Sequence, residues 1–401
     1  DGRTCVPDWR WSPRSAILGG MFEYQRHGTV FAKCAGGLEE PLARELTALG
    51  GRNVEPQYLG VSYQVDPRVL YRTVYESRLA SHILAPLITF ECRNEHDLYN
   101  RVKDLDWSKV LDCDRTFAIQ SHVSDSRITH ARYAAQKMKD AIADRFVEKE
   151  GRRPSVDRET PDVWFDLNIR RNHATISIDA SNGAMHRRGY RKESVTAPMQ
   201  ETLAAAILTG AQWNGERPLY DPMCGSGTVL AEGLLRAGRV PAGWRRCKRK
   251  APVPSLPDYD HAVWDGVRHA AELARKELPA GLIRGSDLDR DAIKATRTNL
   301  RRVPGGGDVE LSRTDFRSLD GVEDSLIVTN PPFGVRLEDR DTAFAIFKDL
   351  GDWLKRSCTG STAWILCGDR ELVGALGLRP KRKIPIRNGG LECVLAELEL
   401  Y

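Results

Sequence analysis

The feature that most constrains the fold is an alternation of apolar strands and helices in the second half of the chain. The run 219–235, LYDPMCGSGTVLAEGLL, is typical of a strand, a glycine-rich turn and a helix. The run 281–300 is typical of a strand, an acidic turn and a helix, and strand-like runs follow at 309–316, 325–333 and 362–369. Strands alternating with helices, several of them continuously apolar, predict a doubly wound, Rossmann-like parallel α/β sheet covered by helices on both faces.

The first half of the chain predicts two smaller α+β units. Residues 29–92 alternate strand-like and helix-like patches, which predicts a unit with an antiparallel sheet. Farther on, a helix is expected over 131–150, and the alternating runs 163–169 and 174–180 predict a hairpin. The expected divisions are a loosely ordered tail at 1–28, two α+β domains at 29–92 and 93–184, and the parallel α/β domain at 185–401.

Composition and charge exclude several classes of protein. The 401 residues include no apolar run long enough to cross a membrane and no apolar signal segment at the start. The nine cysteines lack metal-ligand spacing, so we expect no metal and a reducing, cytoplasmic compartment. The net charge is only +5, but basic clusters at 185–192, 244–250 and 379–383 favour a polyanionic partner. The sequence leaves the oligomeric state open.

The segment DPMCGSGT has the glycines of a ligand-binding turn. Gly225 and Gly227 stand between a strand and an apolar helix, where the backbone must pass close to a ligand. A nicotinamide dinucleotide is disfavoured, because the third glycine of the GxGxxG pattern is missing. The next acidic strand end, Asp287, also lies about 66 residues beyond Asp221, where that fingerprint expects about 20.

Aspartates at three successive strand ends suit S-adenosylmethionine better. Ligands of doubly wound sheets bind outside the carboxyl ends of the strands. There Asp221 can address the cationic methionine moiety, and Asp287 can accept both ribose hydroxyls. Asp315 can accept from the adenine amino group, with Phe316 against the ring. The sequence therefore predicts a site for this sulfonium cofactor.

The segment TNPPFG places an amide and two prolines where a further strand ends. The fixed φ of Pro331 and Pro332 can hold the Asn330 side chain and the Pro331 carbonyl toward one pocket. Two rigid acceptors would orient an exocyclic amine of a nucleobase for attack on a methyl sulfonium, while Phe333 stacks on the base. The pattern therefore predicts methylation of a base amine.

In combination, DPMCGSGT and NPPF resemble the class I S-adenosylmethionine-dependent amino-methyltransferases. The wider context restricts this resemblance to fewer families within that class, through segments 194–208 and 388–398. A THUMP domain preceded by a ferredoxin-like partner is resembled by segments 105–119, 137–146 and 151–167. Together they resemble the bacterial THUMP-domain 23S ribosomal RNA guanine-N2-methyltransferases. The resemblance implies S-adenosyl-L-methionine as cofactor and 23S ribosomal RNA or a ribosomal precursor as partner.

The resemblance also implies roles for individual residues. The catalytic set is Asn330, Pro331, Pro332 and Phe333. The cofactor-binding set is Asp221, Pro222, Cys224, Gly225, Gly227, Thr228, Asp287, Leu288, Asp315, Phe316 and Asn330. Candidates for contacts with RNA phosphates are Arg187, Arg188, Arg191, Lys192, Arg245, Arg246 and Lys248. Many members of the family have tyrosine where this chain has Phe333, and some carry a second methyltransferase domain, so one modification is expected here.

Several alternatives stay open at this point. The same tetrapeptide would serve an adenine-N6 methyltransferase on RNA or DNA, or a THUMP-type guanosine methyltransferase on tRNA. A protein-glutamine methyltransferase would leave the N-terminal half unexplained, and a C5-pyrimidine methyltransferase would need a cysteine beside the catalytic proline, which TNPPFG lacks. A non-catalytic RNA-binding factor is disfavoured by the intact glycines, aspartate and asparagine.

Overall fold

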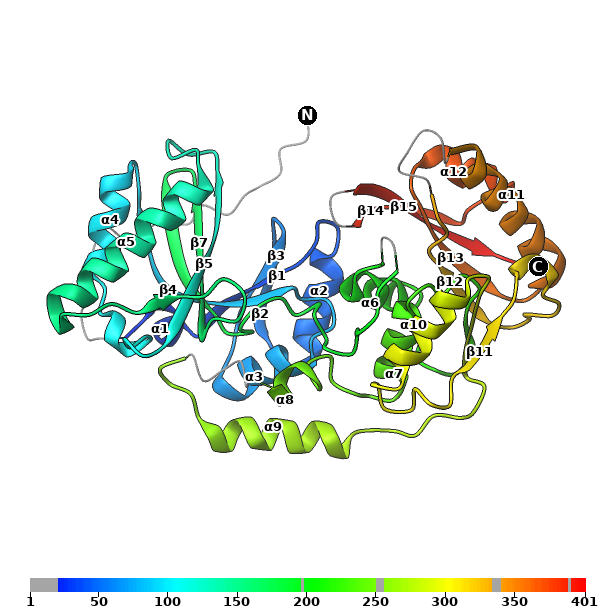
Figure 1. Ribbon diagram of the computed structural model, residues 1–401, viewed down its shortest axis with the longest axis horizontal. Helices are drawn as coiled ribbons and strands as arrows, with labels where there is room; N and C mark the ends of the chain where they lie inside the picture. Colours follow the sequence, from blue (N-terminus) through cyan, green and yellow to red (C-terminus); the bar gives the residue numbers. More distant parts are fainter. Residues whose placement is uncertain (1–20, 196–197, 250–255, 334–339, 389–390) are drawn as a thin grey trace.

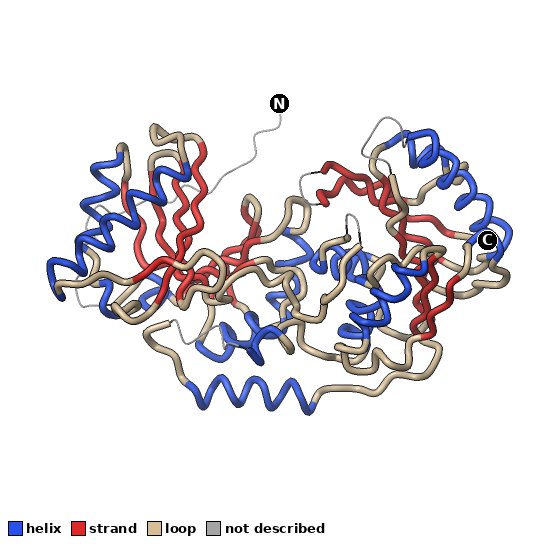
Figure 2. Tube along the Cα trace, in the orientation of Figure 1, coloured by secondary structure: helices blue, strands red, loops and turns tan. Residues whose placement is uncertain are grey.

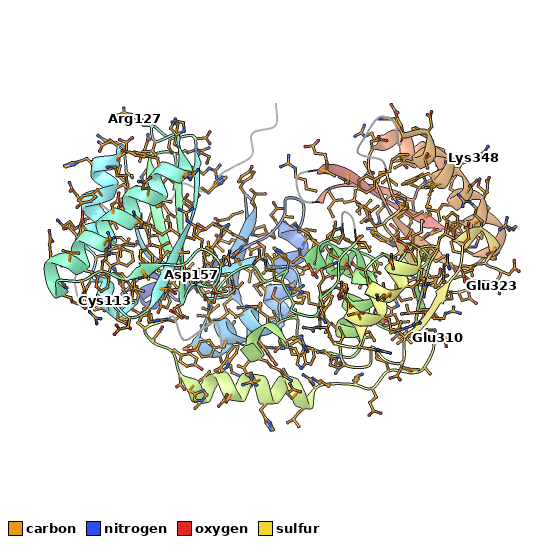
Figure 3. The ribbon with its side chains drawn as sticks, in the orientation of Figure 1. Cys113, Arg127, Asp157, Glu310, Glu323 and Lys348 are labelled. Atoms are coloured by element: carbon orange, nitrogen blue, oxygen red, sulfur yellow. The ribbon has the colours of Figure 1, made fainter. Side chains whose placement is uncertain are left out.

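The chain folds around two β-sheets that lie side by side. The computed structural model describes residues 21–195, 198–249, 256–333, 340–388 and 391–401. We call the halves built on the two sheets the first and the second lobe (Figures 1 and 2). Figure 3 shows their side chains, with Arg127 at the far end of the first lobe and Lys348 on the outer side of the second. Among the described residues, no helix is long and apolar enough to cross a membrane.

The first lobe contains one eight-stranded sheet in the order β2-β3-β1-β4-β8-β7-β5-β6. The two α+β units predicted from sequence each supply four of its strands. They meet where β4 pairs antiparallel with β8 and Leu84 lies opposite Asp179, so the sheet continues from one unit into the other. The strands are β1 Thr29–Lys33, β2 Arg52–Gln57, β3 Gly60–Gln64, β4 His82–Glu91, β5 Thr116–Ser124, β6 Ser155–Val156, β7 Val163–Arg170 and β8 His173–Asp179.

Helices and a tight hairpin complete the first lobe. The helices are α1 Glu23–His27, α2 Glu39–Ala48, α3 Pro67–Glu76, α4 Glu95–Asp104 and α5 Ala131–Glu150, with a 3-10 turn at Trp107–Lys109. The predicted hairpin is confirmed as β7 paired antiparallel with β8. Its two turn residues, Arg171 and Asn172, have φ of 49° and 59°, as a type I′ turn requires.

Helix α1 lies inside the segment that we expected to be a loosely ordered tail. Residues 1–20 lie outside the described residues, but the segment from Met21 onward is held against the sheet. Phe22 and Tyr24 are buried, and the Glu23 carboxylate accepts hydrogen bonds from the Thr89 backbone N–H at 2.8 Å and from its hydroxyl. The expected tail at 1–28 therefore wrongly includes helix α1, which is folded onto the sheet because the Phe22 and Tyr24 side chains are buried in the core.

The second lobe contains a seven-stranded sheet in the order β11-β10-β9-β12-β13-β15-β14. Strands β9 to β13 are parallel, which confirms the predicted α/β sheet, and β15 adds antiparallel to β13. The strands are β9 Leu219–Asp221, β10 Ile283–Asp287, β11 Glu310–Arg313, β12 Leu326–Thr329, β13 Thr362–Cys367, β14 Arg382–Asn388 and β15 Leu391–Glu399. The helices are α6 Glu201–Gly210, α7 Thr228–Ala237, α8 Arg246–Arg249, α9 His261–Leu273, α10 Arg290–Leu300, α11 Arg340–Ser357 and α12 Arg370–Ala375, with a 3-10 turn at Phe316–Ser318.

Strand β12 shows how the sheet separates two cores. Leu326 and Val328 belong to the core shared with α6, α7 and α10, whereas Ile327 belongs to the core under α11 and α12. Successive side chains of a strand point to opposite faces, so an unbroken apolar strand is buried on both sides. Strand β9 is flanked by β10 on one side and β12 on the other, so the strand order reverses between β9 and β12. Ligands of doubly wound sheets bind at the carboxyl ends of the strands at such a reversal.

The two lobes are joined by packing and by buried polar groups. Helix α9 lies below α3 and α8 in Figure 1, and its Trp264 ring packs edge-on against Tyr71 and Tyr75 of α3. The guanidinium of Arg188 pairs with Glu232 of α7 at 3.3 Å and donates to the Arg78 carbonyl of the first lobe. Both members of this ion pair are buried, so the junction is a fixed part of the fold.

Candidate cofactor and active site

The parallel sheet brings the predicted site residues to one edge. In the register of β9 with β10, Asp221 pairs with Gly285, two residues before Asp287 at the end of β10. Strand β12 runs parallel to β9 on its other side and ends just before Asn330. The carboxyl ends of parallel strands lie at the same edge of a sheet, so Asp221, Asp287 and Asn330 are brought to one edge, where the strand ends of β9, β10 and β12 lie (Figure 1).

The glycine-rich turn between β9 and α7 is bent by its two glycines. Gly225 and Gly227 have φ of 55° and 80°, values that favour glycine. A Cβ on Gly227 would lie 2.9 Å from Cγ2 of Thr296 on α10, so only glycine fits this close approach. The predicted neighbours Pro222, Cys224 and Thr228 are buried and support the turn.

The Asp287 carboxylate is oriented by the turn itself. Its Oδ2 accepts from the Gly225 N–H at 2.9 Å, and its Oδ1 accepts from the Asp289 N–H at 2.9 Å. Each carboxylate oxygen has a second lone pair, so the half-buried group can still accept two hydroxyl donors, as the ribose of the cofactor offers. The neighbouring Leu288 is 60% exposed, which leaves an apolar side chain beside that position.

Asp221 is the buried acidic group of the site. Burial raises the pKa of its carboxyl to about 7, and the nearby charge of Asp287 also raises it. The nearby Thr329 hydroxyl and the hydrogen bond from the Met223 N–H at 3.2 Å oppose this rise in pKa. A buried carboxyl with such a pKa gains its charge most easily when a cation is placed beside it, as the methionine moiety of the cofactor would be.

The third aspartate, Asp315, already has hydrogen-bond and ion-pair partners within the protein, which the sequence did not indicate. Asp315 caps the 3-10 turn through the Arg317 N–H at 3.0 Å and pairs with the Arg317 guanidinium at 3.0 Å. Phe316 is buried, with its ring edge-on to Trp353, and Arg317 lies over the same ring. Contacts of these two residues with adenine stay a prediction, and the exposed Leu288 offers a more accessible apolar surface.

Asn330 carries a buried polar atom that a ligand could satisfy. Its Oδ1 is buried, and within the described part of the chain no group hydrogen-bonds to it. An unpaired buried oxygen costs about 1–3 kcal/mol, so folding alone gives no reason to keep it at the end of β12. Pro331 is buried and Pro332 exposed, so the rigid segment turns outward directly after this amide. A donor from a ligand would satisfy the Asn330 oxygen.

The Phe333 side chain lies against Gly368, a residue that the sequence did not indicate. A Cβ on Gly368 would lie 2.8 Å from Cδ2 of the ring and 3.0 Å from Cγ. Gly368 follows β13, the neighbour of β12, so the close contact depends on the parallel register. The WILCGD pattern contains this glycine, but only the pairing of the strands reveals what it accommodates.

The predicted RNA-binding cations divide into two groups. Arg187, Lys192 and Lys248 are exposed and able to meet a phosphate. The others are used by the protein itself. Arg188 is buried in its ion pair, Arg191 bonds to Glu201 and to the glycine-rich turn, Arg246 donates to the carbonyls of Ser181 and Val74, and Arg245 has a protein partner and lies over the Trp244 ring.

A basic groove in the first lobe was also missed from the sequence. A cavity of about 1380 Å³ lies between β5, the first half of α5 and the junction segment. Its cations far outnumber its single acidic residue, Glu159. The basic side chains that line it are Arg132, Lys139, Arg158, Arg187 and Arg246. Arg187 and Arg246 come from two of the basic clusters of the sequence, but Arg132, Lys139 and Arg158 do not, so the sequence indicated only part of this groove.

The fold and the strand-end site define a Rossmann-like methyltransferase with an appended N-terminal lobe. Comparison with family models matches residues 29–84 to the RlmL ferredoxin-like domain, 92–179 to the THUMP domain and 188–397 to the RMKL-like methyltransferase domain. The chain therefore belongs to the RMKL-like methyltransferase family. It is a methyltransferase that uses S-adenosyl-L-methionine, which confirms the predicted family, fold and cofactor.

Individual relatives agree with this assignment. The chain is 35% identical over 372 residues to the Synechocystis sp. protein named "Putative RNA methyltransferase slr0064", covering 92% of this chain and 96% of that one. It is 37% identical over 391 residues to the Syntrophotalea carbinolica protein named "Ribosomal RNA large subunit methyltransferase K/L", covering 92% of this chain and 53% of that protein. This chain thus spans about half the length of the second relative.

Solved structures show the same fold over nearly the whole chain. The structure of a possible methylase from Clostridium difficile 630 aligns with a TM-score of 0.82 and 25% identity, covering 93% of this chain and 98% of that one. The structure of SMU.472, complexed with SAH, aligns with a TM-score of 0.81 and 23% identity over the same shares. Both lobes are included in these alignments.

Proposed function

We propose that the protein transfers a methyl group from S-adenosyl-L-methionine to the exocyclic N2 amine of a guanosine in large-subunit ribosomal RNA. The observation that carries this proposal is the buried Oδ1 of Asn330, which has no hydrogen-bond partner among the residues that the structure describes and lies at the edge shared with Asp221 and Asp287. The name of the Syntrophotalea carbinolica relative supports ribosomal RNA as the substrate. A cytoplasmic location belongs to the same proposal.

The chain's own residues suggest how the amine is held. The Asn330 Oδ1 and the Pro331 carbonyl accept the two N–H groups of the amine, which fixes the direction of the nitrogen lone pair. Asp221, in its ionised form, stabilises positive charge in the neighbouring pocket. The cofactor supplies an electrophilic methyl group on a sulfonium when bound. The methylated nitrogen is strongly acidic and loses its proton to water, so no strong general base is needed.

The first lobe would hold the RNA at a distance from the reacting base. The groove of Arg132, Lys139, Arg158 and Arg187 can bind phosphates without reading sequence, in a salt-dependent way. Tyr58 at the β2–β3 turn is 70% exposed, and the Arg170 guanidinium lies 5.4 Å from its ring centre. An exposed ring paired with an arginine is a stacking surface for an unpaired base.

Methylation of defined RNAs tests the proposal. Purified protein and methyl-labelled cofactor are incubated with unmodified 23S ribosomal RNA, with tRNA and with DNA, and the products are digested to nucleosides. We expect labelled N2-methylguanosine from 23S ribosomal RNA alone. Labelled N6-methyladenosine would refute the choice of base, and labelled tRNA without labelled ribosomal RNA would refute the choice of substrate.

The role of the amide is tested by Asn330→Ala. We expect turnover to fall on the order of 10²-fold, because the acceptor that orients the amine is lost. Asn330 also belongs to the expected cofactor-binding set, but Asp221, Asp287 and the glycine-rich turn are untouched, so cofactor affinity measured by calorimetry should fall far less than turnover. Asn100→Ala, which removes an exposed amide on α4, is the matched control. Turnover of Asn330→Ala equal to that of the control would exclude this role.

A further inference from the structure

We propose that Arg191 is a positioning residue of the cofactor site, which holds the glycine-rich turn from behind rather than binding RNA phosphate. The residue comes from the basic stretch at the junction of the two lobes. Its Nη1 donates to the Ser226 hydroxyl at 2.7 Å, and its Nη2 donates to the Thr228 hydroxyl at 2.9 Å. These two hydroxyls flank Gly227, so one guanidinium grips both sides of the bend.

The rest of the guanidinium is also occupied. Nε donates to Glu201 Oε1 of α6 at 3.0 Å, and Nη2 donates to the Met199 carbonyl at 3.1 Å. The side chain is 19% exposed and that of Glu201 is 8% exposed. Glu201 therefore neutralises the charge of Arg191 beside the turn, so the guanidinium adds little net positive charge where a sulfonium must bind. Its contribution is the geometry of its hydrogen bonds.

A second buried group fixes the same segment to the turn. The Asn299 side chain on α10 is fully buried, and its Oδ1 accepts from the N–H groups of Lys192 at 2.7 Å and Glu193 at 3.0 Å. Its Nδ2 donates to the carbonyls of Glu193 at 2.8 Å and Ser226 at 3.0 Å. The junction segment 191–193 and the turn are thus held together by two side chains.

The turn depends on this support because its own capping is weak. Gly227 is the N-cap of α7 and has no side chain, and no cap bond from a side chain is present there among the described residues. The bend must nevertheless place the Gly225 N–H 2.9 Å from Asp287, the expected ribose ligand. Loosening the hydroxyls on either side of Gly227 would therefore disturb the cofactor site, although Arg191 itself need not touch the cofactor.

Arg191→Lys tests the proposal. Lysine keeps the charge but loses the planar fork that reaches both hydroxyls and Glu201 together. We expect calorimetry to show at least about tenfold weaker binding of S-adenosylmethionine, with KM for the cofactor raised more than kcat is lowered. Affinity for ribosomal RNA at fixed salt should not change. Binding of the cofactor is measured without RNA, so this result stands or fails separately from the proposed choice of base.

Arg236→Lys is the matched control. Arg236 lies near the far end of α7, where it donates to the Trp213 carbonyl and, at 2.9 Å, to the Thr209 hydroxyl. The control loses similar hydrogen bonds but should bind cofactor normally. Equal weakening in both variants, unchanged cofactor affinity in Arg191→Lys, or loss of RNA affinity alone would overturn the proposal. If Arg191→Lys does not fold, Ser226→Ala and Thr228→Val remove the acceptors instead, and normal cofactor affinity in both would overturn it.

Discussion

Asp221→Asn should stabilise the free protein while weakening cofactor binding. The Asp221 carboxyl is 3% exposed at the end of β9, and burial raises its pKa to about 7 from an ordinary value of 3.8. Between these two pKa values the folded protein therefore holds a proton that the unfolded chain has already released. An asparagine has nearly the same shape but no charge to bury, so it avoids this penalty and also loses the anion that attracts a cationic ligand.

The size and sign of the effect follow from this difference in pKa. Below about pH 4 the carboxyl is protonated in both the folded and the unfolded chain, and it causes no loss of stability. Between about pH 4 and pH 7 only the unfolded chain releases the proton, so each pH unit lowers the free energy of unfolding by about 1.4 kcal/mol. Above about pH 7 the loss is complete and amounts to about 4 kcal/mol.

Urea denaturation of both proteins from about pH 4.5 to about pH 8, a range that covers most of the interval between the two pKa values, measures this effect. We expect Asp221→Asn to be more stable by up to about 4 kcal/mol at about pH 8, with a difference that shrinks steadily toward the acid end. Asp320→Asn, which changes an exposed carboxylate, is the control and should match the parent throughout. A variant no more stable than the parent at the alkaline end, or a difference independent of pH, would refute the reasoning.

Two further substitutions test contacts that only the structure reveals. Gly368→Ala would push a Cβ to 2.8 Å from Cδ2 of Phe333, so we expect the ring to move and turnover to fall on the order of 10²-fold. Gly374→Ala is the control, because its new Cβ meets nothing within 4 Å and turnover should be kept. If Gly368→Ala turned over as fast as Gly374→Ala, the proposed role of the contact between Gly368 and Phe333 would be contradicted. Glu232→Gln removes the charge that pairs with the buried Arg188, so urea denaturation should show a free energy of unfolding lower by about 3–5 kcal/mol. A decrease below about 1 kcal/mol would contradict the importance of this ion pair.

The sequence by itself determined the local elements and the chemistry of the sheet edge. The hairpin of β7 and β8, the parallel sheet and the bend at Gly225 and Gly227 follow from short-range patterns of apolar residues and glycines. Asp221, Asp287 and Asn330 could be grouped from the order of strands and polar residues alone, because parallel strands carry their carboxyl ends to one edge whatever their arrangement in the sheet.

Only the tertiary structure decided what the individual side chains do. Arg188 and Arg191 look like phosphate-binding residues in the sequence, yet one is buried in an ion pair and the other bonds to the glycine-rich turn. The continuous sheet of the first lobe, the basic groove and the contact of Gly368 with Phe333 depend on pairing between segments distant in the chain. The residue type of a charged residue or a glycine does not say whether it is buried or exposed. Its partner is fixed by packing between segments that are distant in the chain.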